Sequence, residues 1–173
     1  MNGGAAVGWV KAGVLLALGL WGLLVAAGRA SWWFLDGVNL IFHEAGHLIF
    51  WVGGEFVSIL GGSVLQVLVP AACAIAFVWQ HQPFGAGLCG IWTAQSLVGV
   101  SLYIADARTQ DLPLLGGDGV IHDWNYLLGR LGLLAWDLAL GRATAVLAGL
   151  IIVGSAVLAA LLCQRPPQET PEA

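Results

Sequence analysis

Long apolar stretches divide this chain, and they constrain its fold more than any other feature of the sequence. A helix of about 20 apolar residues crosses the hydrocarbon core of a bilayer. A soluble domain of this size buries only about 70% of the surface that its unfolded chain exposes, so it could not hide these stretches. We therefore expect an all-α polytopic membrane protein with about five transmembrane helices. The stretches cover approximately residues 9–27, 37–52, 56–79, 84–105 and 143–163.

The low charge of the chain excludes several classes of protein. Charged residues make up only 9% of the 173 residues, against about 25% in an ordinary soluble domain. Six Lys and Arg against ten Asp and Glu give a net charge of −4, so the chain lacks the basic surface that meets nucleic-acid phosphates. We expect a multi-pass protein of the inner or plasma membrane. Its expected partners are membrane lipid and a membrane-associated protein or peptide substrate.

The domain organisation follows from the same pattern. Residues 1–163 are expected to form a single membrane domain. Residues 127–140 are apolar but carry Arg130 and Asp137, and each charge would cost about 3 kcal/mol at the centre of a bilayer. We interpret this segment as a re-entrant or interfacial helix rather than a further span. Residues 164–173 include three prolines, which predicts a disordered polar tail.

One motif in the second apolar stretch is typical of a catalytic metal site. His43, Glu44 and His47 form an H-E-x-x-H pattern. On a helix, residues four apart share a face, so both imidazoles can reach one Zn²⁺ ion. Glu44 lies beside that face, where a carboxylate can take a proton from a metal-bound water. Ionisable residues within an apolar span are expensive and mark functional sites, so we predict a zinc site with Glu44 as the general base.

The motif in this setting resembles the site-2 protease family of intramembrane zinc metalloproteases. The resemblance covers about a dozen residues around the motif, together with the several further apolar spans. It implies that His43 and His47 ligate zinc and that Glu44 is the catalytic base. The family's third ligand is an aspartate of a later D-G motif on another membrane segment. In this chain one D-G pair, at Asp36, precedes the motif, and another, at Asp118, follows it in a polar loop.

The third zinc ligand is expected in the polar segment 116–124. The motif helix is predicted to end on the side of the membrane where this segment lies, and its glycines permit a re-entrant turn. We favour His122, because imidazole suits zinc and the neighbouring Asp123 could orient it. Asp118, which would preserve the aspartate of the family pattern, and Asp123 are the alternatives.

These residues favour an intramembrane zinc metalloendopeptidase that hydrolyses peptide bonds of membrane-associated substrates. A non-catalytic zinc-binding membrane protein of the same ancestry, with a structural or regulatory role, is the alternative. A metal-ion carrier is a third interpretation, but it needs a polar path through the spans, and the sequence contains a single polar cluster. Glu44 discriminates among these hypotheses, because only a hydrolase needs it as a base.

Overall fold

The computed structural model describes residues 3–30, 33–115 and 120–164, and these residues form helices and connecting turns with no strand. The predicted all-α class is therefore confirmed. Of the expected tail, all but Gln164 lies outside the described residues. The α-helices are α1 (Gly3–Ala26), α2 (Trp33–Ile49), α3 (Glu55–Trp79), α4 (Pro83–Ala105), α5 (Asp123–Leu131) and α6 (Asp137–Cys163), with 3₁₀ turns η1 (Trp51–Gly53) and η3 (Leu134–Trp136).

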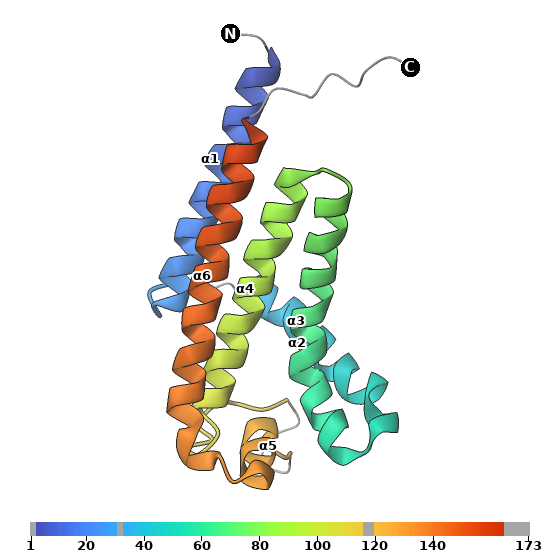
Figure 1. Ribbon diagram of the computed structural model, residues 1–173. Coiled ribbons are helices and arrows are strands. Elements are labelled where there is room, and N and C mark those ends of the chain that lie inside the picture. The colour runs from blue at the N-terminus through green and yellow to red at the C-terminus, as the bar shows by residue number, and fades with distance from the viewer. Residues whose placement is uncertain (1–2, 31–32, 116–119, 165–173) are drawn as a thin grey trace.

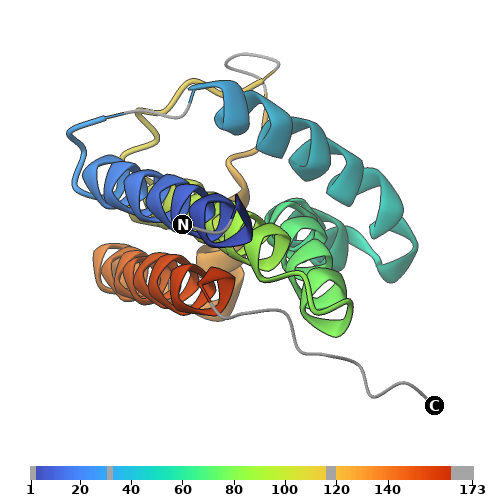
Figure 2. The same ribbon diagram turned by 90° about the horizontal axis from the view of Figure 1, so that it is seen from above.

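In the described residues, four helices are long and apolar enough to cross a membrane, which is fewer than the expected five. The missing one is α2, which has 17 residues and so extends only about 26 Å. Figure 2 shows α2 nearly lengthwise and apart from α1, whereas α3 and α4 are seen closer to end-on. The four candidate spans are Ala5–Ala26, Glu55–Trp79, Pro83–Ala105 and Leu134–Cys163.

The segment 127–140 does not form the single interfacial helix that we expected. Helix α5 ends at Leu131, because Gly132 adopts the left-handed conformation (φ 69°) that terminates helices. The chain then makes the η3 turn, and α6 begins at Asp137. Arg108 forms a two-pronged ion pair with Asp137, with N···O distances of 2.8 and 2.7 Å. Because the Asp137 side chain is almost wholly buried, this pair fixes the start of α6 against the loop after α4.

Helix α4 lies at the centre of the bundle and contacts α1, α3 and α6 (Figure 1). Small residues allow these helices to approach closely, as in membrane proteins generally. A Cβ added at Gly87 would lie 2.5 Å from the Ala159 side chain, and one at Gly19 would lie 2.6 Å from that of Ala156. The loop after α4 and the short helix α5 lie at the opposite end of the bundle from the start of α1 (Figure 1).

Helix α2 is polar on its buried side and apolar on its exposed side, the reverse of a helix in a soluble protein. Its buried side includes Asn39 and His43, which are 5% and 7% exposed, whereas Ile41 and Leu48 are 68% and 78% exposed. An apolar outer face and a polar inner face suit a helix surrounded by lipid, because the polar groups then find partners within the protein. The polar face packs on α3 and the centre of α4, and it carries the motif histidines.

Candidate metal centre

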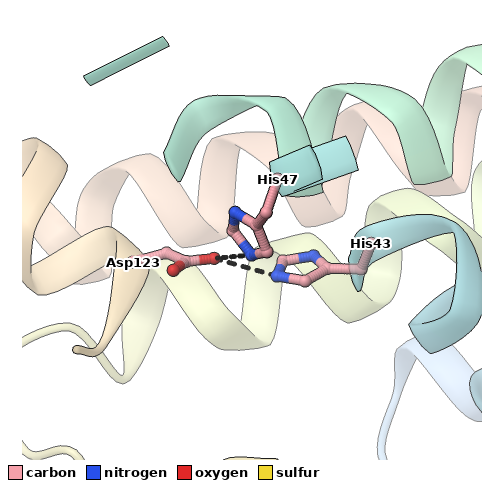
Figure 3. A group of neighbouring side chains, drawn as sticks. All are labelled: His43, His47 and Asp123. Atoms are coloured by element: carbon pink, nitrogen blue, oxygen red, sulfur yellow. Dashed lines mark hydrogen bonds and ion pairs between the residues drawn. The ribbon is translucent and has the colours of Figure 1, made fainter. Parts of the chain in front are cut away.

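Three side chains from distant parts of the chain converge between α2 and the start of α5. His43 and His47 project from one face of α2, and Asp123 is the first residue of α5 (Figure 3). The Oδ2 atom of Asp123 lies 2.8 Å from His43 Nε2 and 3.4 Å from His47 Nε2. The three atoms all lie within 4.8 Å of one another. This group could hold a metal ion.

The other nitrogen of each imidazole faces a hydrogen-bond acceptor. Gln66 of α3 donates through Nε2 to the Ser96 carbonyl (3.2 Å), so its Oε1 faces His43 Nδ1 at 2.8 Å. His47 Nδ1 lies 3.0 Å from the Ser58 carbonyl oxygen. Because both acceptors lack a proton to give, each Nδ1 must carry the hydrogen.

This tautomer leaves both Nε2 lone pairs directed at the Asp123 carboxylate. Three electron-pair donors of one cluster therefore meet at one point. Such an arrangement is unfavourable with neutral imidazoles alone, and a bound cation turns it into three ligand bonds. The hydrogen bonds to Nδ1 are those that orient histidines in known metal sites.

A glycine of α3, Gly62, and a glycine of α2, Gly46, leave room for this cluster. A Cβ on Gly62 would lie 2.8 Å from His43 Nε2 and 2.8 Å from His47 Nε2. One on Gly46 of α2 would lie 2.2 Å from the Gly61 carbonyl oxygen, so α2 and α3 are in backbone contact here. The bare face of α3 at Gly62 therefore borders the point where the ligand atoms meet.

A polar network ties the other half of α2 to α4. Asn39 Nδ2 donates to Gln95 Oε1 (2.6 Å), and Gln95 donates in turn to Asp36. Trp92 Nε1 and Ser96 Oγ both donate to Asn39 Oδ1, at 2.8 and 3.0 Å. The network joins α2 to the centre of α4. Asp36, in the D-G pair before the motif, belongs to this network and lies outside the ligand group that the described residues form.

The structure places His122 away from the two motif histidines, in contrast to our preferred assignment. His122 precedes α5, and its Nδ1 accepts from the Asn125 backbone N–H (3.2 Å), so it caps the helix. Its Nε2 lies 3.1 Å from Asp106 Oδ2. Both ring nitrogens are thus engaged, and it is Asp123, one of the two alternatives, that faces the histidines. The other alternative, Asp118, lies outside the described residues.

Helix α5 is held so that Asp123 faces α2. Trp124 Nε1 donates to Ser63 Oγ of α3 (3.1 Å), and Asn125 Nδ2 donates to the Ala107 carbonyl (2.8 Å). The Asp123 backbone N–H donates to the Tyr103 hydroxyl oxygen at 3.1 Å. These contacts join α5 to α3, to α4 and to the loop that follows α4. Gln66, Ser58 and Tyr103 were not singled out as site residues from the sequence, although Gln66 is a strongly polar side chain within an apolar span.

Glu44 is exposed and lies on the same helix as the two motif histidines. Within the described part of the chain, its carboxylate forms no hydrogen bond or ion pair, so it is free to take a proton. It immediately follows His43 on α2 and precedes His47 by three residues, and residues three apart on a helix are neighbours.

Asp106 organises the loop between α4 and α5. Burial opposes its ionisation, but the hydrogen bonds that it accepts outweigh burial and lower its pKa below the usual value of 3.8. The ionised Asp106 carboxylate therefore holds together the loop that positions Asp123. The donors are the Thr109 hydroxyl (2.7 Å), the backbone N–H groups of Asp111 (2.9 Å) and Leu112 (3.1 Å), and His122 Nε2 (3.1 Å).

Replacing Asp106 by asparagine is expected to lower the free energy of unfolding at pH 7 by about 2 kcal/mol, the scale of hydrogen bonds to a charged group. Because the pKa of Asp106 is lower in the folded state, its contribution is present above pH 4 and is lost as the pH falls through that lowered pKa. The difference from wild type should shrink below about pH 4. Thermal unfolding in detergent, followed by tryptophan fluorescence at several pH values, measures this.

The exposed Asp111 offers a matched control, since only its backbone takes part in the loop. Asp111→Asn should unfold like wild type at every pH. A constant difference between wild type and Asp106→Asn from pH 7 to pH 3 would contradict the role given to the Asp106 carboxylate.

Comparisons with known proteins add no assignment. No family model, curated protein or solved structure matches this chain.

Proposed function

We propose that this chain is a multi-pass membrane metallopeptidase that holds zinc through His43, His47 and Asp123. Its resemblance to the site-2 protease family implies the two histidine ligands, and the geometry of the cluster supports Asp123 as the third. The observation that carries the proposal is the meeting of two Nε2 atoms and one carboxylate oxygen, while both Nδ1 atoms are committed to fixed acceptors. Two histidines and one carboxylate form a known ligand set of catalytic zinc.

Zinc held by these residues would lower the pKa of a bound water to about 7 and polarise a substrate carbonyl. Glu44 supplies the proton transfers. It takes a proton from the water as the water oxygen bonds to the peptide carbon, and it returns the proton to the amine as the carbon–nitrogen bond breaks. The products are an amine and a carboxylic acid, which releases its remaining proton to water, and Glu44 ends in its starting state.

The position of His122 favours a catalytic site over a structural one. A closed zinc site has four protein ligands, whereas a catalytic site has three and keeps one position open. His122 is the residue that would close the site, and its two ring nitrogens are engaged by Asn125 and Asp106. Among the described residues, the ligand group thus has three members.

The surroundings of the cluster favour a substrate that is itself in the membrane. The outer face of α2 is apolar, with Ile41, Leu48 and Ile49 all more than half exposed, and four further helices are apolar enough to cross a bilayer. A peptide segment that reaches Glu44 must pass beside these surfaces. Membrane-associated proteins or peptides are therefore the proposed substrates.

The Glu44→Gln variant tests the proposal. Wild type and variant are loaded with zinc and reconstituted in vesicles that contain a membrane-protein extract, and new N-termini are identified by mass spectrometry. Wild type should generate new N-termini in or near apolar segments, and Glu44→Gln should generate them at least about 100-fold more slowly, as for loss of a general base. Both proteins should hold equal zinc.

The alternative, a non-catalytic zinc protein, predicts a different result in the same experiment. Wild type and Glu44→Gln would then both hold zinc, and neither would generate new N-termini. The matched control is Glu55→Gln, because Glu55 lies at the start of α3 and hydrogen-bonds Tyr126 rather than a motif residue. Its activity should equal that of wild type.

A further inference from the structure

Tyr103 lies in the last turn of α4, beside the candidate metal centre. Its ring centroid is 5.9 Å from that of His43 and 4.3 Å from that of His122. Its hydroxyl oxygen accepts a hydrogen bond from the backbone N–H of Asp123, at 3.1 Å. The phenol group is therefore held between a ligand histidine and the residue that supplies the ligand carboxylate.

The hydroxyl hydrogen of Tyr103 has no acceptor among the described residues. The oxygen already receives the Asp123 N–H, which makes the remaining O–H a stronger donor. The hydroxyl of Tyr126, the other tyrosine, instead donates to Glu55 at 2.8 Å. The Ser58 hydroxyl, which also lies near the cluster, donates to the His47 carbonyl at 2.7 Å. Tyr103 thus offers an unused donor beside the three ligand residues.

We propose that the Tyr103 hydroxyl donates a hydrogen bond to the negative oxygen that forms on the substrate carbonyl when water attacks it. This inference rests on the proposed function. It would make Tyr103 a catalytic residue with a role separate from that of Glu44, which moves protons. Fixed donors aimed at a developing oxyanion are a major source of catalytic rate enhancement, because they need no rearrangement during the reaction.

The rigidity of Tyr103 supports this role. The hydrogen bond from Asp123 N–H fixes the phenol oxygen relative to a ligand residue, and contacts with two imidazole rings limit rotation of the tyrosine ring. A donor for an oxyanion must be held in place before the charge appears. A flexible surface tyrosine would not meet this requirement.

Two zinc-binding probes test the inference without a known substrate. A dipeptide phosphoramidate has a tetrahedral phosphorus whose negative oxygens imitate those of the carbonyl after water has attacked it. A dipeptide thiol of the same sequence binds zinc through sulfur instead. Their dissociation constants are measured by calorimetry on the zinc-loaded full chain in detergent, for wild type, Tyr103→Phe and the control Tyr126→Phe. Zinc content is measured for each protein.

Tyr103→Phe should weaken phosphoramidate binding by about 10- to 100-fold, the scale of one hydrogen bond to a charged group. Thiol binding and zinc content should stay within about twofold of wild type, and Tyr126→Phe should bind both probes normally. Equal affinities of wild type and Tyr103→Phe for the phosphoramidate would overturn the inference. So would equal weakening of both probes or loss of zinc, since either would show a purely positioning role through Asp123.

Failure of the proposed function gives a different pattern. If wild-type protein holds no zinc, or holds zinc but binds neither probe, the open metal site itself is absent and the role of Tyr103 is overturned with it. If wild type binds zinc and both probes, and only the Tyr103→Phe result fails, the metallopeptidase proposal stands and the assignment of Tyr103 alone is wrong.

Discussion

Replacing Gly62 by alanine should lower zinc affinity by about 100-fold, the upper end of the effect of residues that support metal ligands. The added methyl carbon would lie 2.8 Å from the Nε2 atoms of both His43 and His47, well inside van der Waals contact. Moving α2 away from α3 to make room would break their close backbone contact at Gly46 and Gly61. The methyl group should therefore displace the imidazoles.

Competition with a zinc-chelating dye, performed in detergent, gives the affinity. Gly149→Ala is the matched control. Gly149 lies on another apolar helix, α6, and a Cβ added there would meet nothing within 4 Å. It should bind zinc like wild type. If Gly62→Ala also retains wild-type affinity, the ligand atoms do not meet beside Gly62, and the account of the site is wrong.

The second large effect is expected at Gln66. Replacing it by leucine removes the acceptor of His43 Nδ1–H and leaves that N–H buried without a partner. Loss of such a partner lowers metal affinity by about 10- to 100-fold, because the imidazole loses both its fixed orientation and part of its basicity. The dye competition assay measures this change, and the pH must be held constant because protons compete for the ligands.

Gln95→Leu is the control for Gln66→Leu. Gln95 is also a buried glutamine in an apolar span, but it bonds Asn39 and Asp36 rather than a ligand histidine. We expect Gln95→Leu to lower the unfolding temperature yet to keep zinc affinity within about threefold of wild type. Equal zinc affinities of the two variants would show that the Gln66 hydrogen bond does not orient His43.

The sequence predicted the regular spans well. The expected segments 56–79 and 84–105 agree closely with α3 (Glu55–Trp79) and α4 (Pro83–Ala105), because a polar turn and Pro83 interrupt the apolar sequence between them. The same reasoning failed for α2. Its apolar residues lie on the outside and its polar residues face α3 and α4, so total hydropathy counted it as a span although it is short.

The first two members of the His43–His47–Asp123 cluster were predictable as neighbours and the third was not. Helical spacing alone places His43 and His47 on one face, since residues four apart are neighbours. The choice between His122 and Asp123 depends instead on where α5 begins. His122 caps that helix through its own Nδ1, which turns its ring towards Asp106, a residue 16 positions earlier. No pattern in the sequence specifies that long-range contact.

The most direct test of the central claim is the amount of metal bound per chain, determined by elemental analysis of protein purified without chelators. Wild type should carry about one zinc ion, whereas His43→Ala and Asp123→Ala should carry almost none. His122→Asn should retain it, because asparagine also caps helices and His122 is not a ligand in this account. Zinc retained by Asp123→Ala but lost by His122→Asn, or no metal in wild type, would contradict the His43–His47–Asp123 site.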